Sequence, residues 1–181
     1  MAREGQGAAF PPGMGTGQAM LAEASNTLAD SMMKIDHCLG QLTDADMSYR
    51  PRPEMNSIAI VINHLCGNLR QWLISGLGGA PDQRNRPAEF QDPGQVTVTQ
   101  MREKLKAVLA EVDAVLAKLP PDDLLRTRRV QGWEVTGMYA LWHTISHFVG
   151  HTHQIVQWTR LIKGPSYQFD FVPRGKEQGG A

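Results

Sequence analysis

Apolar residues recur at steps of three and four in four separate segments of the chain, and this spacing is typical of amphipathic helices. Each apolar stripe can be buried only against the others, so the pattern predicts an all-α four-helix bundle with one core. Strand patterns are weak, with brief candidates at Gln95–Val98 and Tyr167–Val172. The predicted helical segments are residues 21–42, 57–75, 97–119 and 136–163.

Residues with capping side chains stand at the starts of three of these segments. Asn56 or Ser57, Thr97 and Thr136 can each accept a hydrogen bond from a free backbone N–H of the first turn. A glutamine follows Thr97 three residues later, which is the form of a capping box. A proline pair follows the third segment and a Gly-Pro pair follows the fourth, so both helices are expected to end there.

Two long connectors separate the helices. Residues 76–95 are rich in glycine and proline and predict a long loop between the second and third helices, and such loops are often functional or mobile. Residues 122–135 are interpreted as a connector, with Arg126-Thr127-Arg128-Arg129 as a solvated surface turn and not a binding patch. The expected organisation is a flexible N-terminal tail at 1–17, a bundle at 18–172 and a C-terminal tail at 173–181.

Composition and charge narrow the classes of function. The chain has 181 residues, enough for one domain, and its formal net charge is zero. A nucleic-acid partner is therefore not expected, because phosphate contacts usually require a basic excess. The start of the chain has no signal-peptide pattern and no apolar run is long enough to span a membrane, so a cytoplasmic location is expected. Cys38 and Cys66 do not form a CxxC pair and are interpreted as small buried apolar residues, with a reactive thiol as the alternative.

The histidines carry the candidate chemistry. His147 and His151 are four residues apart, so a helix places both imidazoles on one face about 6 Å apart, where they can bind one metal ion. His143 adds another step of four, but each step turns about 40° around the helix, so three imidazoles cannot all point equally well at one ion. His64 lies at the edge of the second apolar stripe and can supply a ligand from a facing helix. The predicted metal ligands are His64, His147 and His151.

Other polar residues are candidates for supporting roles. His143 is expected beside the ligands, His153 at the surface and His37 as a hydrogen-bonded core residue. Asn68 and Gln154 could orient a ligand or a bound water, and helix–helix hydrogen bonding is the alternative for each. Three histidine ligands leave at least one coordination position open, which is the geometry of a catalytic metal site.

Five short segments follow one another in a distinctive order and spacing, beginning with Asn56–Ala59 and His64–Asn68 and including His147–Ile155. Together they resemble the DinB/YfiT-like superfamily over about residues 20–176. Thr152-His153 departs from the resemblance, because the family more often has a residue followed by glycine there. The matching segments are Asn56–Ala59, His64–Asn68, Arg84–Phe90, His147–Ile155 and Pro173–Lys176, of which the third and last resemble an uncharacterised branch.

The resemblance implies a four-helix bundle with a long crossover between the second and third helices, and frequently a homodimer. It also implies a three-histidine metal site on His64, His147 and His151, with zinc or nickel as the expected ion. Relatives in the superfamily include thiol-dependent transferases and isomerases, so a low-molecular-weight thiol is an expected partner. Fold-level kinship alone does not fix the reaction.

Two hypotheses for function follow. The first is a metal-dependent enzyme that transfers a thiol to a small electrophile or hydrolyses a small molecule with metal-bound water, although no carboxylate stands at a motif position for a general base. The second is a non-catalytic metal or small-molecule binding protein linked to stress or detoxification. An open cleft beside the ion would favour catalysis, and an ion screened by Trp72, Trp142 or Trp158 would favour binding. Arg84, Arg86 and Arg174 are candidate anion contacts.

Overall fold

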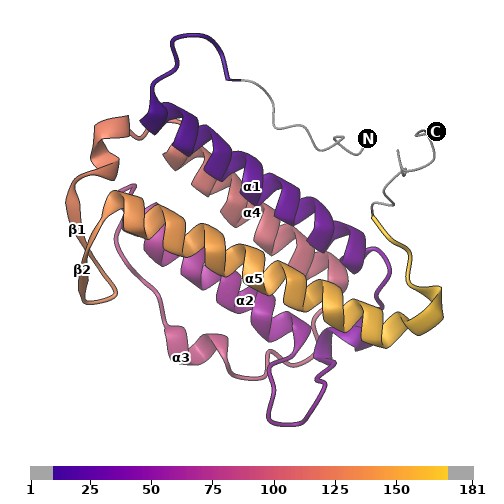
Figure 1. Cartoon of the computed structure of the whole chain (residues 1–181). Helices are drawn as coiled ribbons and strands as arrows, with labels where there is room; N and C mark the ends of the chain where they lie inside the picture. The colour runs from indigo at the N-terminus through magenta and orange to yellow at the C-terminus, as the bar shows by residue number, and fades with distance from the viewer. Residues whose placement is uncertain (1–9, 171–181) are drawn as a thin grey trace, which may run out of the picture.

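The computed structural model describes residues 10–170, and its long helices form a bundle (Figure 1). A short helix, α3 (Arg86–Glu89), lies in the connection between α2 and α4, and the strands β1 (Thr127–Val130) and β2 (Trp133–Thr136) precede α5. The predicted all-α four-helix bundle with a long crossover is confirmed, with a small two-stranded sheet added. The long helices are α1 (Thr16–Leu39), α2 (Ile58–Leu69), α4 (Val98–Leu116) and α5 (Gly137–Lys163).

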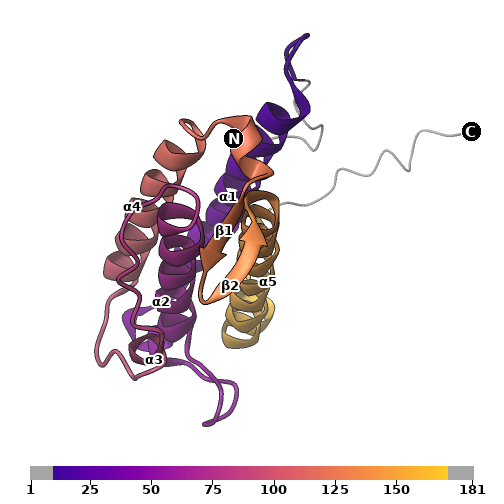
Figure 2. The same cartoon turned by 90° about the vertical axis from the view of Figure 1, so that its left-hand side faces the viewer.

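Each long helix packs against two others, in the order α1, α5, α2, α4 around the bundle (Figure 2). Helices α1 and α5 begin at one end of the bundle, and α2 and α4 begin at the opposite end (Figure 1). Because α2 and α4 run in the same direction, the chain between them must return along the length of the bundle. This crossover carries α3 back against α2.

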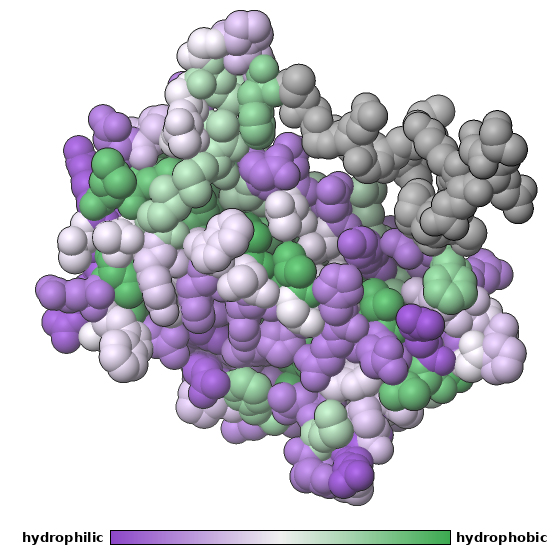
Figure 3. Space-filling view, in the orientation of Figure 1, coloured by the Kyte–Doolittle hydropathy of each residue, from purple (hydrophilic) through white to green (hydrophobic). Residues whose placement is uncertain are grey.

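The core is built from the apolar stripes of all four long helices. On the face shown in Figure 3, hydrophilic residues predominate and hydrophobic residues form patches between them. This division between the two sides of each helix is the one that the sequence pattern predicts. Fully buried side chains include Leu28, Ile35, Ile62, Leu65, Leu105 and Phe148.

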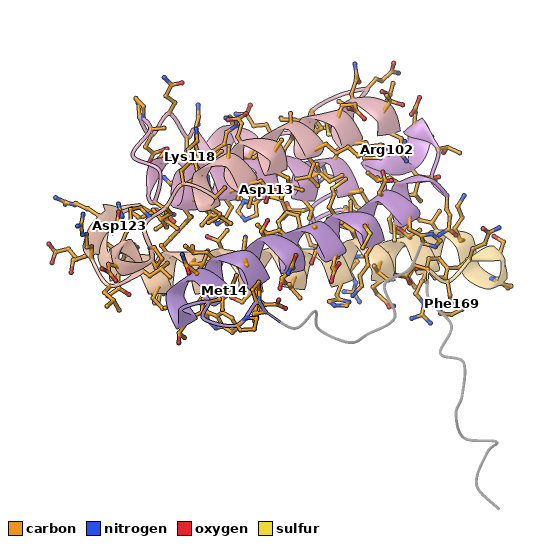
Figure 4. All side chains as sticks on the ribbon, turned by 90° about the horizontal axis from the view of Figure 1, so that it is seen from above. Met14, Arg102, Asp113, Lys118, Asp123 and Phe169 are labelled. Atoms are coloured by element: carbon orange, nitrogen blue, oxygen red, sulfur yellow. The ribbon has the colours of Figure 1, made fainter. Side chains whose placement is uncertain are left out.

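Polar links at the surface join α1 to α4. Arg102, labelled near the start of α4 in Figure 4, places Nε 2.6 Å from Oδ1 of Asp36 on α1. Asp113, further along α4, accepts a hydrogen bond from the Ser25 hydroxyl of α1. Exposed pairs of this kind contribute about 1 kcal/mol or less each, so they help to align the two helices while the core supplies most of the stability.

The second helix changes its geometry at its end. It continues beyond Leu69 as a π-helical segment, Arg70–Ser75, in which Gly76 N–H donates to the Gln71 carbonyl at 3.0 Å. The predicted extent to residue 75 is therefore right, but the last turn and a half is wider than an α-helix. Segments of this kind are rare and occur frequently at functional sites.

The connector at 122–135 contains a hairpin that the sequence analysis missed. Strands β1 and β2 pair antiparallel, and the pairing of Val130 with Trp133 leaves a two-residue turn at Gln131-Gly132. Both turn residues have positive φ, 53° and 84°, as a type I′ hairpin requires. The prediction of a solvated arginine turn is wrong for Arg128, which is half-buried in β1 and donates to Asp123 at 2.8 Å.

Other predictions about the ends and strands have mixed outcomes. The described residues of the two strand candidates, Gln95–Val98 and residues 167–170, are not in strands. Residues 1–9 of the predicted N-terminal tail and all of the predicted C-terminal tail, 173–181, lie outside the described residues. Within the described part of the chain, no helix has the length and apolar character needed to cross a membrane.

The start of α4 offers a test of the predicted caps. Thr97 accepts a hydrogen bond from Gln100 N–H at 3.1 Å, and the Gln100 side chain accepts from Thr97 N–H at 2.8 Å. We expect Thr97→Ala to lower the free energy of unfolding by about 1 kcal/mol, because the Gln100 N–H loses its acceptor. Urea unfolding followed by circular dichroism measures the change. Thr99→Ala, at an exposed position two residues on, should cause no loss.

Candidate metal centre

Three imidazoles meet between α2 and α5. His64 comes from α2, and His147 and His151 come from successive turns of α5, its neighbour in the bundle. One ring nitrogen of each residue lies within 4.8 Å of the others, and His64 Nε2 is 2.9 Å from His147 Nε2. The structure therefore brings together the three histidines that the sequence analysis singled out, and such a cluster could bind a metal ion.

A carboxylate from the crossover fixes the orientation of His64. Glu89, the last residue of α3, places Oε2 2.9 Å from His64 Nδ1. Arg84 holds this carboxylate from the other side, with Nε 2.6 Å from Oε1 and Nη2 2.8 Å from Oε2. Arg84 Nη2 also lies 3.3 Å from His64 Nδ1. When His64 Nδ1 carries the hydrogen that it donates to Glu89, the contact between Arg84 Nη2 and His64 Nδ1 joins two donors and is not a hydrogen bond.

These contacts select which ring nitrogen is free. With its Nδ1–H donating to Glu89, the neutral His64 ring carries its lone pair on Nε2, the atom that faces His147. His151 is arranged in the same way, because its Nδ1 lies 2.7 Å from the amide oxygen of Gln154. Two of the three rings are thus held with Nε2 available to a ligand. Histidine ligands of metal ions usually have this kind of partner on the other nitrogen.

The Arg84–Glu89 pair belongs to a larger network that ties the crossover to α2. Arg84 Nη1 donates to the Gln71 side chain at 2.8 Å, and the Gln71 amide donates to Asp82 at 2.8 Å. The side chains of Arg84 and Glu89 are only 3% and 10% exposed. Gly67 makes the close approach possible, since a Cβ there would collide with the Glu89 carboxylate. The network therefore connects the π-helical segment to the orientation of His64.

The cluster is open on one side. A hollow of about 440 Å³ adjoins it. Among the described residues, no tryptophan lines this hollow. Trp72 is buried and packs instead against His143, with 4.3 Å between ring centroids, while Trp142 is 67% exposed. The hollow is lined by His143, Ser146, His147, Gly150, His151 and Gln154.

His143 lies beside the cluster and is not part of it. Its ring is parallel to that of His147, with centroids 6.0 Å apart and an interplanar angle of 7°. The stack continues to Tyr139, one turn earlier, at 5.8 Å and 11°. The drift around the helix that limits three successive imidazoles explains this separation. His143 is therefore a wall of the hollow.

The donor set fits a divalent transition metal. Two ligands of a tetrahedral ion at Zn–N distances near 2.0–2.1 Å lie about 3.4 Å apart, and the 2.9 Å between His64 Nε2 and His147 Nε2 is within a small side-chain adjustment of this value. Neutral imidazole suits zinc, nickel, copper and iron. The pKa of His147 is lowered from 6.5 to about 3 by burial and by the neighbouring histidines, and that of His64 is lowered mainly by burial. Both rings are thus neutral at physiological pH.

These lowered pKa values predict the response of the metal-free protein to acid. The unfolded chain takes up protons on both histidines below pH about 6.5, whereas the folded chain takes them up only at lower pH. The contribution of these two neutral histidines to the free energy of unfolding is therefore fully present above pH about 6.5 and is lost progressively toward pH 3. Thermal unfolding of the metal-free protein from pH 7.5 to 4.5 should show this decline. His147→Gln should flatten it, and His153→Ala, on the exposed side of α5, should leave it unchanged.

Several other predicted site residues lie elsewhere. Asn68 is buried in α2 and does not line the hollow. His153 is exposed as expected, whereas His37 is half-buried and places Nε2 2.6 Å from the Gln168 carbonyl. Arg86 lies over the Phe90 ring, with 5.0 Å from its guanidinium carbon to the ring centroid. Arg174 lies outside the described residues.

Two further outcomes concern residues named for other roles. Arg84 is committed to Glu89 and Gln71 and is not a free anion contact. Both cysteines are buried, as predicted, and burial raises the pKa of Cys66 to about 11 and also raises that of Cys38. Neither thiol is therefore ionised at neutral pH.

Glu89 is the functional residue that the sequence analysis missed. No periodic pattern places it near the histidines, because it follows a loop. Its carboxyl is buried, which raises the pKa, but hydrogen bonds from Arg84 and His64 outweigh burial and hold the pKa below its usual value. The available signal was local: Asn85 caps α3 by accepting from Ala88 N–H at 3.3 Å, and Pro87 stands in the first turn.

Comparison with solved structures supports the fold. A conserved protein from Enterococcus faecalis aligns with a TM-score of 0.62 and 21% identity, over 79% of this chain and 96% of that one. A DinB-like protein, YjoA from Bacillus subtilis, aligns with a TM-score of 0.62 and 17% identity, over 81% of this chain and 96% of that one. No curated protein matches the chain.

The bundle and these similarities define a protein with a DinB-like fold. The chain belongs to the family described as protein of unknown function (DUF1572), whose model matches residues 15–176. The resemblance inferred from the sequence motifs is confirmed at this level.

Proposed function

We propose that this protein is a metal-dependent enzyme that binds one divalent transition-metal ion, zinc or nickel, through His64, His147 and His151. The observation that carries the proposal is the convergence of three ring nitrogens within 4.8 Å. The hydrogen bonds from Nδ1 of His64 to Glu89 and of His151 to Gln154 support it, since they leave Nε2 free on both rings. The adjoining hollow gives a small molecule access to the open side.

A metal ion bound there would lower the pKa of a coordinated water or thiol and so supply a nucleophile at neutral pH. The chain's own residues favour the thiol reaction. Glu89 is held by Arg84 and His64, and among the described residues that line the hollow there is no carboxylate to act as a general base. Cys38 and Cys66 are buried and protonated, so the thiol must come from solution.

We therefore propose transfer of a low-molecular-weight thiol to a small electrophile. The thiol sulfur forms a bond to the electrophilic carbon, the leaving group departs with the electron pair of its bond, and the thiol proton passes to solvent. His143, Ser146 and Gln154 line the space in which the electrophile would lie. The proposal also includes a small-molecule substrate, a cytoplasmic location and assembly as a homodimer. It includes no nucleic-acid or membrane partner.

Metal loading followed by a thiol titration tests this function. The purified protein is stripped with chelator and loaded with zinc, nickel or cobalt(II), and metal content is measured by elemental mass spectrometry. Cysteine and glutathione are then added to the cobalt(II) protein, where a sulfur-to-cobalt charge-transfer band is expected in the near ultraviolet. Turnover is followed with 1-chloro-2,4-dinitrobenzene, which releases chloride when the thiol adds.

The two steps separate catalysis from simple binding. A charge-transfer band together with metal-dependent turnover supports the enzyme. Metal binding with no band and no turnover for thiols or for ester substrates would instead favour the non-catalytic binding protein. A protein that takes up none of the three metals would contradict the proposed enzyme and leave only the small-molecule form of the alternative.

A further inference from the structure

An aromatic cleft lies between the hairpin and His143, a residue that also lines the hollow beside the three histidines. It has a volume of about 590 Å³, which is within the range of small-molecule sites. Its ring-bearing walls come from three elements: Trp72 from the π-helical segment, Trp133 from β2, and Tyr139 and His143 from the first two turns of α5. Figure 2 shows the hairpin in front of α2 and α5, at the end where α5 begins.

The cleft and the hollow lie on either side of His143. This residue lines both, and the rings of Tyr139, His143 and His147 follow one another in parallel at spacings of 5.8 and 6.0 Å. A molecule about two aromatic rings long would therefore reach from the hairpin to the three-histidine cluster.

The exposure of the rings is unusual for a surface that serves only the fold. Trp133 is 69% exposed and Tyr139 is 54% exposed, although each has a large apolar face. Burial of such faces by a ligand is favourable by about 25 cal/mol per Å² of apolar area. Exposed aromatic residues grouped around a cleft often mark a site of interaction.

The charge of the cleft selects among aromatic ligands. Glu134 is the one formally charged side chain among the described residues that line it, and His143 is neutral because burial lowers its pKa. A carboxylate beside aromatic faces attracts a cation, which is also stabilised over the face of a tryptophan or tyrosine ring. It repels an anion.

We propose that this cleft binds the aromatic body of the substrate, as a cationic or uncharged molecule, while the reactive end of that molecule reaches the three-histidine cluster. The second half of the statement rests on the proposed metal-dependent function. Trp72, Trp133 and Tyr139 supply apolar contact, Glu134 supplies the preference for positive charge, and His143 joins the two parts of the site.

Binding of three probes to the metal-free protein tests the cleft independently of the metal. The probes are benzyltrimethylammonium, benzyl alcohol and benzenesulfonate, which share an aromatic ring and differ in charge, and ligand-observed NMR measures their dissociation constants. We expect the ammonium to bind most tightly and the sulfonate at least tenfold more weakly. Equal binding of the sulfonate and the ammonium would overturn the proposal.

Matched variants locate the probes. Trp133→Ala and Tyr139→Ala should each weaken the ammonium at least tenfold, and Glu134→Gln should remove its advantage over benzyl alcohol. Trp142→Ala removes a similarly exposed ring of α5 that does not line the cleft, so it should have no effect. Circular dichroism confirms that each variant is folded. Equal loss of binding in Trp142→Ala and Trp133→Ala would contradict the assignment.

Two more measurements separate this proposal from its alternatives. In the cobalt(II) protein, paramagnetic broadening of the bound probe is expected if cleft and cluster are one site. Failure of the protein to bind any metal would overturn the proposed function but leave probe binding in the cleft as a separate result. Sedimentation tests whether a second copy of the chain occupies the cleft. If the native protein is a dimer and Trp133→Ala converts it to a monomer that binds no probe, the cleft is a dimer interface and the proposed ligand site is overturned.

Discussion

We expect His147→Ala to abolish stable metal binding, with content falling from about one ion per chain to none after dialysis. Structural zinc sites supply about 10–16 kcal/mol from their whole ligand set, so loss of an equal share from one of three protein ligands should weaken affinity by roughly 300- to 8000-fold. His147 Nε2 faces His64 Nε2 at 2.9 Å, and the pKa of His147 is lowered more strongly than that of His64. Its loss should therefore remove the centre of the cluster.

Thermal stability gives an independent measure of the same change. At a zinc concentration 100 times the dissociation constant, an ion that binds only the native state stabilises it by about 2.7 kcal/mol. The native protein should show this increase in the unfolding transition, and His147→Ala should not. The control is His153→Ala, which removes an exposed imidazole from the same helix and should keep both metal content and the thermal shift. Equal zinc uptake by His147→Ala and the native protein would contradict the assignment of this ligand.

The helices and the three clustered histidines could be predicted because their determinants are local. Apolar periodicity fixes which face of each helix is buried, and a spacing of four places His147 and His151 on one side of α5. The depth of His64 follows from its place at the edge of the stripe on α2, and the residue is 8% exposed. Facing helices then bring the three rings together.

The rest of the site depends on contacts between segments that are distant along the chain. Glu89 reaches His64 across 25 residues, through a crossover whose path is set by hydrogen bonds among the Arg84, Gln71 and Asp82 side chains. The apolar periodicity of the helices carries no information about the course of this crossover. The hairpin was missed for a different reason, because its strands are only four residues long and its turn, Gln131-Gly132, lacks the more usual asparagine or aspartate.

The second large effect concerns the orientation of His64. We expect Glu89→Gln to weaken metal binding by about 10- to 100-fold with all three histidines in place, which is the usual effect of losing the partner of a histidine ligand. An amide can still accept from His64 Nδ1, but it lacks the charge that makes the ring a better donor to a metal. Competition with a chelator of known affinity measures the change, and Glu103→Gln, an exposed carboxylate on α4, is the matched control.

The same substitution should loosen the crossover. The Arg84 side chain is 3% exposed. Without the Glu89 carboxylate, its buried guanidinium loses the anion that now accepts its hydrogen bonds. A buried charge that loses its partner is costly, and local opening of a surface segment relieves this cost more easily than global unfolding. Hydrogen exchange should therefore accelerate in residues 80–90 and remain unchanged in α1. Unaltered exchange there would show that the network does not hold the crossover in place.

Gly67→Ala separates the position of the carboxylate from its charge. The added Cβ would collide with Glu89 Oε1, so the carboxylate must move away from His64 although no charge has changed. Alanine is also favoured over glycine inside a helix by about 1 kcal/mol, so α2 itself is not weakened. We expect metal affinity to fall by roughly tenfold, within the range for a lost ligand partner. Because Gly67→Ala and Glu89→Gln disrupt one contact, the double variant should be little worse than Glu89→Gln alone. Fully additive losses would mean that Gly67 acts on the metal centre by some route other than Glu89.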